Sequence, residues 1–352
     1  MTFRIDQREI GPGERPYLIA EMSGNHNQSL DRALEIVDEA AGCGADAIKL
    51  QTYTADTITL DVDTPDFIID DPKSLWNGQR LYDLYDEAHT PWDWHKPIME
   101  RAAKHGLHCF SSPFDATAVD FLEDLGVPAY KIASFELVDI PLIEKVAATG
   151  KPMIMSTGMG SAEDIDRAVK TARKAGAQDI VLLKCTSTYP ASPENTNLAT
   201  IPNMRETFGC MVGLSDHTMG TGVSVASVAM GAVLIEKHFT LQRSDGGVDS
   251  AFSMEPEEFA RLRDDTEKAW QAMGDVTYGG TQAEEGSRVF RRSLYIARDV
   301  KAGEELTPEN LRAVRPGHGL PPHHLKDLLG KRVARDIAAG TAANWSMFMP
   351  AK

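Results

Sequence analysis

Eight short apolar runs, each followed by a stretch of helical periodicity, constrain the fold of this chain more than any other feature. The runs that predict strands are 17–23, 47–53, 108–114, 129–134, 153–158, 180–186, 211–217 and 234–240. They are apolar enough to be buried on both faces, as the strands of a parallel sheet are. An eightfold strand–helix alternation is typical of a (β/α)8 TIM barrel in the α/β class. An open doubly wound sheet is the alternative, but its glycine fingerprint is not evident in the sequence.

The periodicity changes after a last helical segment near residues 257–273. A connector rich in Gly and Glu follows, and short strands and turns then replace the strand–helix units. We therefore expect a catalytic barrel domain at residues 1–275, a linker at 276–287 and a small, mostly β domain at 288–352. A domain of about 60 residues is near the lower limit for a core that folds alone.

The charge of the chain is strongly negative and unevenly distributed. The formal net charge of −16 argues against nucleic acid as a partner, because broad phosphate neutralisation requires a basic surface. From Arg288 onward, however, 12 Lys and Arg stand against 6 Asp and Glu. We expect this basic tail to pack against the acidic body or to reach toward an anionic ligand.

The sequence also predicts a cytoplasmic protein without a membrane anchor. No run approaches the ~18 apolar residues that a membrane span needs, and no signal peptide is visible at the N-terminus. The four cysteines, Cys43, Cys109, Cys185 and Cys210, are far apart and form no CxxC pair. We expect free thiols in a reducing compartment.

Polar side chains gather at the C-terminal ends of the predicted strands, where a barrel of this kind places its active site. The strand ends read EMSGNHN, KLQTY, SSPFD, KIASFE, STGM, KCTSTYP, SDHT and EKHFT. Period-two alternation gives three pairs of residues that share a face: Lys49 with Gln51, Ser215 with His217, and Glu236 with His238. Asp216 and Lys237 point the opposite way.

His217 and His238 end neighbouring strands, a geometry that suits one divalent ion with open positions for water and substrate. Glu236 or a nearby carboxylate could complete the shell. The same two imidazoles could instead act as acid and base or simply form hydrogen bonds, so the spacing alone leaves the metal open.

Two lysines predict an anion site in the mouth of the barrel. Lys49 and Lys131 would bring two positive charges that suit a small polyanion such as a phosphorylated carboxylate. The hydroxyl donors that could assist them are Ser111, Ser112, Ser134 and Ser156. The rival interpretation is a Schiff-base aldolase in which Lys131 or Lys184 is the nucleophile.

Three carboxylates, Glu21, Glu136 and Asp249, are candidates for proton transfer or for binding sugar hydroxyls. Glu21 could instead be an ion-pair partner of Lys49. We expect residues 243–253 to form a flexible loop that closes over the site. The tryptophans of residues 54–94, Trp76, Trp92 and Trp94, could line a sugar pocket or pack the core of that insert.

Taken together, these segments resemble the sialic acid synthase family. The resemblance rests on IAEMSGNHN, GADAIKLQTY, SSPFD, YKIAS, MSTGM, GLSDHT, IEKHF and RPGHGL, and it covers almost the entire chain. The C-terminal segment is similar to the antifreeze-like (SAF) domain of the family. Within the family, LWNGQRLYDLYDEAHTPWDWH, KCTSTYP and FRRSLY are most similar to the pseudaminic acid branch.

The resemblance implies a metal-dependent condensation of phosphoenolpyruvate (PEP) with an N-acetylated sugar aldehyde. The products are a nine-carbon 2-keto acid and phosphate, released by C–O cleavage. In the pseudaminic branch the acceptor is 2,4-diacetamido-2,4,6-trideoxy-L-altrose; the N-acetylneuraminate and legionaminate branches are the alternatives. The implied metal is Mn²⁺, or else Mg²⁺ or Co²⁺. A Schiff-base lyase and a non-catalytic sugar-binding protein are the alternatives from other classes.

The resemblance also assigns roles to residues. The PEP-binding residues would be Lys49, Lys131, Ser134 and Ser215, together with Ser111, Ser112 and Ser156. The acceptor would be bound by Gln51, Glu136, Tyr189 and Asp249. Catalysis would fall to Glu21 and Glu136, which handle protons, and to His217 and His238, which hold the metal. Arg315 would reach the acceptor in the barrel of a partner subunit, which implies a domain-swapped homodimer.

One position departs from the family pattern. Ser187 stands where sialic acid synthases commonly carry Asn. The shorter side chain could leave room for a differently substituted sugar.

Overall fold

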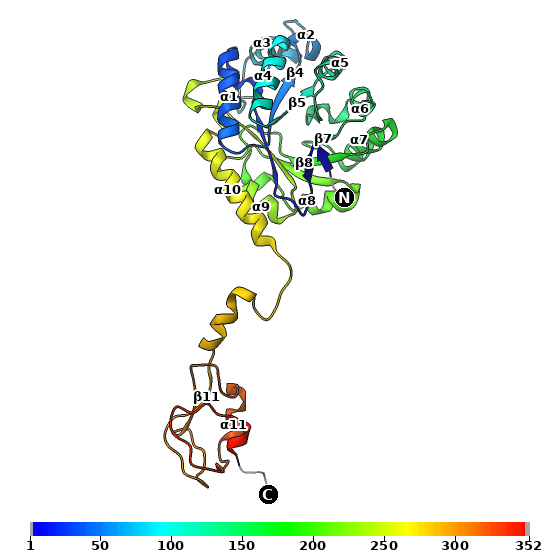
Figure 1. The fold of residues 1–352 in the computed structure, drawn as a ribbon. Helices are drawn as coiled ribbons and strands as arrows, with labels where there is room; N and C mark the ends of the chain where they lie inside the picture. Colours follow the sequence, from blue (N-terminus) through cyan, green and yellow to red (C-terminus); the bar gives the residue numbers. More distant parts are fainter. Residues whose placement is uncertain (1–2, 349–352) are drawn as a thin grey trace. The chain divides into compact units, whose positions relative to one another are not determined.

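The computed structural model describes residues 3–348, and eight parallel strands in it close into a barrel (Figure 1). The strands are β3 (Tyr17–Glu21), β4 (Ala47–Thr52), β5 (His108–Pro113), β6 (Tyr130–Ile132), β7 (Met153–Ser156), β8 (Ile180–Cys185), β9 (Met211–Ser215) and β10 (Leu234–His238). Around the barrel they follow one another in chain order, and β10 pairs with β3 to close it. The predicted fold class is confirmed. Each strand ends one or two residues before its predicted end, because the last predicted residues leave the ladder at the mouth.

The strands alternate with helices that cover the outside of the barrel (Figure 1). The helices are α1 (Leu30–Gly42), α4 (Trp92–Lys104), α5 (Ala116–Leu125), α6 (Ile140–Ala147), α7 (Ala162–Ala175), α8 (Thr200–Phe208), α9 (Gly222–Ala229) and α10 (Pro256–Met273). Their starts follow ordinary capping chemistry: the Ser29 side chain accepts a hydrogen bond from the Arg32 backbone N–H at the start of α1.

A short N-terminal hairpin, β1 (Phe3–Ile5) paired with β2 (Arg8–Ile10), closes the end of the barrel opposite the mouth. Phe3, Ile5 and Ile10 are fully buried in one cluster with Tyr17 and Phe110, which fill the barrel interior. We did not predict this hairpin, because three-residue strands are too short for a period-two pattern to stand out.

The connection between β4 and α4 is a long insert at residues 54–91. It contains α2 (Ala55–Ile58), a 3-10 turn η2 (Pro65–Phe67) and α3 (Leu81–Ala88). Between the turn and α3 the chain folds back on itself, since the Ile69 N–H donates to the Gln79 carbonyl (2.9 Å) and the Gly78 N–H to the Ile69 carbonyl (2.7 Å). The insert lies beyond the C-terminal end of β4, beside the mouth of the barrel.

The chain divides into two compact units, Met1–Gly274 and Asp275–Lys352. The second unit contains an extended 3-10 segment η7 (Gln282–Phe290), an antiparallel pair β11 (Ser293–Ile296) and β12 (Leu311–Val314), and one short helix α11 (Leu325–Leu328). Its core is a small cluster of buried apolar side chains that includes Leu294, Ile296, Val300, Leu311 and Val333. The predicted boundaries at 275 and 288 stay predictions, and residues 349–352 of the predicted tail domain lie outside the described residues.

Two further features bear on the predictions from composition. All four cysteines are free thiols, and Cys109, Cys185 and Cys210 are buried, as expected. None of the helices within residues 3–348 combines the length and the apolar character that crossing a bilayer requires.

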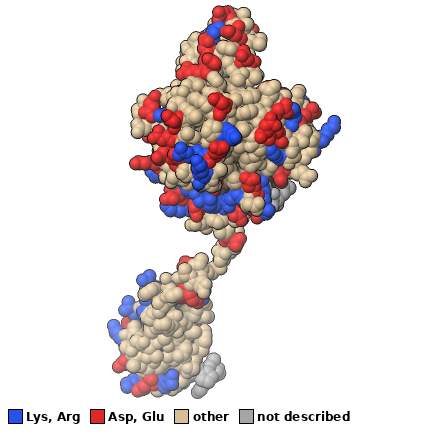
Figure 2. Space-filling view, turned by 45° about the horizontal axis from the view of Figure 1, so that its top comes forward, with Lys and Arg blue, Asp and Glu red and all other residues tan. Residues whose placement is uncertain are grey.

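On the face of the barrel unit that Figure 2 shows, Lys and Arg side chains are interspersed with Asp and Glu.

Candidate active site

The C-terminal ends of the barrel strands open into a cavity of about 470 Å³, a size that suits a small-molecule site. Thirteen candidate site residues from the sequence line it: Lys49, Gln51, Trp76, Lys131, Ser134, Glu136, Ser156, Tyr189, Ser215, His217, Glu236, His238 and Asp249. The barrel topology explains their meeting, because it brings the ends of all eight parallel strands to one mouth.

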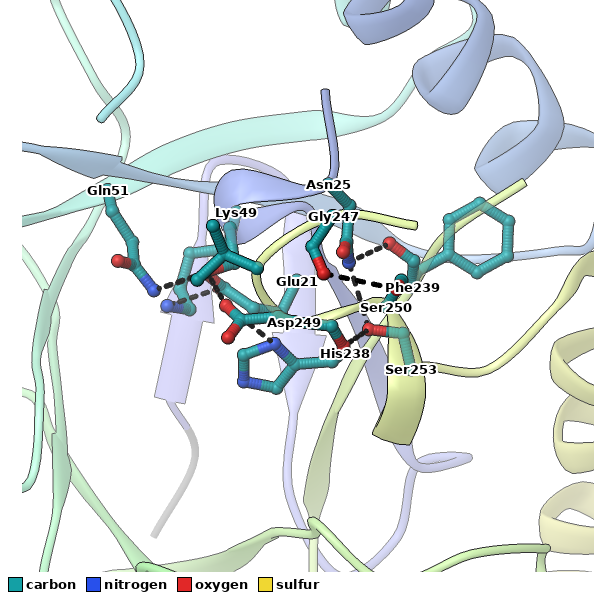
Figure 3. A network of polar contacts seen from close by, with 12 residues as sticks. Glu21, Asn25, Lys49, Gln51, His238, Phe239, Gly247, Asp249, Ser250 and Ser253 are labelled. Atoms are coloured by element: carbon teal, nitrogen blue, oxygen red, sulfur yellow. Dashed lines mark hydrogen bonds and ion pairs between the residues drawn. The ribbon is translucent and has the colours of Figure 1, made fainter. Parts of the chain in front are cut away.

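A buried ion pair joins Lys49 on β4 to Glu21 at the end of β3. Gln51 extends the pair, since its Nε2 donates to Glu21 Oε1 at 3.0 Å (Figure 3). Lys49 Nζ donates to Ser112 Oγ at 3.3 Å. Burial raises the pKa of the Glu21 carboxyl to about 7, a shift that the neighbouring Lys49 ammonium limits. Glu21 is therefore the ion-pair partner of Lys49 that the sequence allowed, and it still titrates near neutral pH.

A second buried pair lies across the barrel floor. Lys131 Nζ on β6 is 3.5 Å from Glu236 Oε1 on β10, and Ser215 Oγ donates to the same oxygen at 3.2 Å. Glu236 Oε2 and Ser156 Oγ are buried with no hydrogen-bond partner. Unpartnered buried polar atoms are costly, so these two atoms point to a ligand that would satisfy them.

The rings of His217 and His238 lie with their centroids 5.3 Å apart. His217 Nδ1 is 2.9 Å from the Thr186 carbonyl oxygen, which leaves its Nε2 for other contacts. His238 Nδ1 is buried without a hydrogen bond and lies 3.7 Å from Asp249 Oδ2 (Figure 3). Burial lowers the pKa of His238 well below its usual range, so this imidazole is neutral. Within residues 3–348, no group of three His, Cys, Asp or Glu side chains is arranged as a complete metal site.

The segment that follows β10 is held by hydrogen bonds from the connection after β3. It contains the 3-10 turns η5 (Arg243–Asp245) and η6 (Ser250–Phe252). Asn25 Nδ2 donates to the Phe239 carbonyl and to Ser253 Oγ, each at 2.9 Å (Figure 3). Ser23 Oγ donates to Asp249, which holds that carboxylate against the cavity. The expected flexible loop is thus an anchored segment in this structure.

Six predicted residues of the barrel unit lie outside the cavity lining. Glu21 and Ser112 contact Lys49 from behind the lining, and the others are Ser111, Trp92, Trp94 and Lys184. Ser111 does not reach the cavity: it pairs with Leu50 in the ladder, faces the helices, and its Oγ is 2.6 Å from Thr52 Oγ1. Trp92 stacks on Phe121, with ring centroids 4.6 Å apart, so of the three tryptophans only Trp76 lines the cavity. Lys184 donates to the Cys185 carbonyl at 2.8 Å and lies outside the lining.

Arg315 belongs to the second unit, where it is exposed. Its predicted role in a partner barrel stays a prediction.

The outward orientation of Asp216 and Lys237 is confirmed. Lys237 Nζ lies 3.2 Å from Asp216 Oδ2, and Ser224 Oγ of α9 donates to that oxygen at 2.6 Å. This buried network joins β9 and β10 to the helical layer, away from the cavity.

Sequence reasoning missed Ser23 and Cys185, both of which line the cavity. Strict alternation along β8 would have found Cys185, because Val181 and Leu183 face the barrel interior. Burial raises the pKa of the Cys185 thiol, but hydrogen bonds to His217 and Ser134, together with the nearby charges of His217 and Lys131, outweigh burial and lower the pKa to about 6. Ser23 has a positive φ of 48°, a conformation unusual for Ser that aims its hydroxyl at Asp249.

Known protein families match most of the chain. A model of the NeuB family matches residues 36–278, and a model of the SAF domain matches residues 291–349. The chain is 44% identical over 329 residues to the pseudaminic acid synthase of Campylobacter jejuni subsp. jejuni serotype O:2, which covers 94% of this chain and 95% of that protein. It is 41% identical over 327 residues to the pseudaminic acid synthase of Helicobacter pylori, which covers 93% and 96%.

A solved structure agrees in fold. The N-acetylneuraminic acid synthetase of Leptospira borgpetersenii, crystallised with citrate, superposes with a TM-score of 0.73 at 30% identity. The match covers 82% of this chain and 95% of that one.

Proposed function

The chain belongs to the NeuB family, and we propose that within it the protein catalyses the pseudaminic acid synthase reaction. PEP, water and 2,4-diacetamido-2,4,6-trideoxy-L-altrose would give pseudaminic acid and phosphate. The observation that carries the proposal is the placement of two buried lysines and two neighbouring histidines in one cavity, in a chain that matches pseudaminic acid synthases along more than 90% of its length.

PEP would bind at the barrel floor. Lys49 and Lys131 supply positive charge for its phosphate and carboxylate, and Ser134, Ser156 and Ser215 supply hydroxyls. The unpartnered Ser156 Oγ supports this assignment, because a bound anion would satisfy it. Ser112 contacts the Lys49 ammonium and would act through it.

The acceptor would bind above PEP, against Gln51, Glu136, Tyr189 and Asp249. The enol carbon of PEP attacks the aldehyde carbon, water adds at C2, and the tetrahedral intermediate expels phosphate as its C–O bond breaks. One group must give a proton to the aldehyde oxygen, and another must take one from the attacking water. Glu136, which lines the cavity, and Glu21, which contacts the lining residues Lys49 and Gln51, suit these tasks, because burial raises the pKa of each carboxyl to about 7.

The residues at the mouth fit a divalent cation. His238 has a buried, neutral and unpartnered Nδ1, Asp249 Oδ2 lies 3.7 Å from it, and the His217 ring is adjacent. His217 and His238 would hold the ion, with Asp249 or Glu236 beside them. We assign Mn²⁺, with Mg²⁺ or Co²⁺ as alternatives; when bound, the ion would polarise the aldehyde oxygen of the open-chain sugar.

We further propose that the enzyme is a domain-swapped homodimer in the cytoplasm. Arg315 of the tail would bind the acceptor in the partner barrel, which would explain the positive charge of the tail. Four free cysteines suit a reducing compartment.

The test is phosphate release from PEP by metal-stripped protein, with and without added Mn²⁺. The acceptors compared are the diacetamido altrose, its legionaminic-type counterpart and N-acetylmannosamine. We expect release only with the altrose and the metal. Release with another acceptor would move the enzyme to another branch, and no release with any acceptor would contradict the proposal.

A matched pair of variants sharpens the same assay. Lys131→Met should lower the rate at least 100-fold, whereas Lys184→Met should stay within a few-fold of the native rate, because Lys184 does not line the cavity. Borohydride trapping with substrate should label no lysine; a labelled lysine would indicate the Schiff-base alternative.

A further inference from the structure

The cavity has two chemically different sides. The floor, at the strand ends, is charged and polar. The opposite wall comes from residues 54–91, and we call its seven lining residues the insert wall: Ile58, Ile69, Trp76, Leu81, Leu84, Tyr85 and Ala88. Only Trp76 and Tyr85 among them carry a polar side-chain atom. The Trp76 indole N–H already donates to the Val248 carbonyl at 3.0 Å, so it is not free for a ligand.

The insert wall is apolar only on its inner side. The insert carries many acidic residues, and those that are exposed include Asp56, Asp61, Asp63, Asp66, Asp70, Asp71, Asp83, Asp86 and Glu87. These charges lie on the exposed side of the insert, whereas its apolar side chains gather toward the cavity. Their gathering toward the cavity therefore indicates a ligand surface, as in other small-molecule sites lined by apolar residues.

Contacts between the insert and the barrel hold the wall in place. The Tyr85 ring packs edge-on against Tyr53, which follows β4, with centroids 5.8 Å apart. The Trp76 and Tyr189 rings lie 6.0 Å apart, and Tyr189 in turn packs against His217 at 4.4 Å. The backbone bonds between Ile69 and both Gln79 and Gly78 fix the turn that presents Ile69. The wall is thus preformed.

We propose that the insert wall binds the C4–C6 end of the acceptor and selects a sugar that is apolar there, an inference that rests on the proposed function. The aldehyde carbon must lie at the polar floor, where PEP would bind. In an extended six-carbon sugar the opposite end then points away from the floor, toward the insert. A deoxygenated C6 and the methyl of a 4-acetamido group present apolar surface to Ile69 and Leu81.

A hydroxyl at C6 would be a poor fit to this wall. It would give up its hydrogen bonds to water and find few partners among these side chains. Apolar pockets discriminate against one added hydroxyl by about 10- to 100-fold. We expect the native enzyme to prefer the 6-deoxy acceptor by that factor in kcat/KM.

The experiment compares two acceptors that differ only at C6: 2,4-diacetamido-2,4,6-trideoxy-L-altrose and its 6-hydroxy analogue. The wall variants are Ile69→Thr and Leu81→Asn, each no larger than the native residue but more polar. The matched controls are Ile68→Thr and Leu75→Asn, exposed residues of the same insert that do not line the cavity. We expect each wall variant to lower the kcat/KM ratio of the two acceptors about 10-fold, through the acceptor KM, with the PEP KM unchanged. The controls should keep the native ratio.

The outcomes separate the inference from the function on which it rests. If the native enzyme uses the 6-deoxy acceptor and the wall variants keep the native ratio, the inference is overturned and the proposed function stands. If wall and control variants lose activity equally on both acceptors, the wall has only a structural role, and the inference is overturned as well. If the native enzyme uses neither sugar, the proposed function fails and the inference fails with it.

Discussion

The buried environment of Glu136 changes the pKa of its carboxyl. This residue lies in the 3-10 turn η3 (Phe135–Val138), after β6, and its Oε2 is buried without a hydrogen-bond partner. Burial raises the pKa of its carboxyl from 4.5 to about 7. Since the folded protein binds this proton more tightly than the unfolded chain, the associated stability is present below pH 4.5 and is lost as the pH rises through 7.

Glu136→Gln should therefore stabilise the protein at high pH. At pH 8 the free energy of unfolding should rise by about 1–3 kcal/mol relative to native, because the variant carries no charge to bury. Near pH 4.5 the two proteins should be equally stable. Urea unfolding at both pH values measures the difference, with the exposed Glu144→Gln on α6 as the control. Equal stability of native and Glu136→Gln at pH 8 would show that Glu136 is not held in a desolvated site.

Ser187, the position that departs from the family pattern, packs closely against Gly158. Gly158 N–H donates to Ser134 Oγ at 3.2 Å, and a Cβ on Gly158 would overlap the hydroxyls of Ser187 and Ser134. The chain segments after β7 and β8 therefore approach closely, and Ser187 packs against Gly158 instead of lining the cavity. A longer side chain at 187 would require this packing to change.

At the scale of elements, hydrogen bonds through Arg32 and Asn25 join the connections that follow β3 and β10. We call this hydrogen-bonded link the clasp. Arg32 on α1 is central to it: Nε donates to the Asn25 carbonyl, and Nη1 to Asp245 Oδ2, each at 2.8 Å. Asn25 in turn binds the segment that carries Asp249 (Figure 3). The clasp would position the proposed acceptor residue Asp249, although Asn25 and Arg32 do not line the cavity themselves.

Arg32→Ala should weaken acceptor binding with little effect on the chemical step. We expect the acceptor KM to rise about 10-fold while kcat changes less than about threefold, because the variant loosens a positioning segment and leaves the floor intact. Steady-state kinetics with saturating PEP measures both. Arg261→Ala on α10 removes a surface pair and should match native. A fall in kcat alone would contradict the positioning role.

The Lys237–Asp216 network is a stability element, and breaking it should be costly. Lys237→Met leaves the buried Asp216 carboxylate without its cation, so we expect the free energy of unfolding to fall by about 3–5 kcal/mol. Lys170→Met, which removes the exposed pair with Asp166, should cost less than about 1 kcal/mol. Urea denaturation of both variants tests the contrast, and equal costs would exclude a structural role for the buried pair.

At the scale of the whole molecule, the question is whether the second unit contributes to the site that the first unit builds. The cavity is lined by residues of Met1–Gly274, and Arg315 is an exposed residue of the other unit. A homodimer in which each tail serves the partner barrel would join the two.

Subunit mixing tests this arrangement. Arg315→Ala and Lys131→Met should each be inactive alone. After equimolar mixing under conditions of subunit exchange, about a quarter of native activity should return, because half of the dimers would contain one intact barrel served by one intact tail. If Arg315 acts within its own chain, mixing restores nothing, since neither chain has both an intact barrel and an intact tail.

Local patterns were enough to predict the barrel and most of its site. Apolar runs and helical stretches follow from short-range periodicity, and eight of them in series leave few topologies open. Once the barrel is assumed, the ends of its strands must meet. Lys49, Lys131, His217 and His238 therefore could be placed in one cavity from the sequence.

Tertiary structure alone decided which partners those residues have. Ser112 rather than Ser111 contacts Lys49, and Cys185 rather than Lys184 lines the cavity, because one step in register reverses the direction of a side chain. The N-terminal hairpin has strands too short for a periodic signal. Leu81, Leu84, Tyr85 and Ala88 of the insert wall do have helical spacing, but that spacing does not say what the helix faces. Their positions depend on packing against residues far away in the chain, and a sequence pattern carries no information about such contacts.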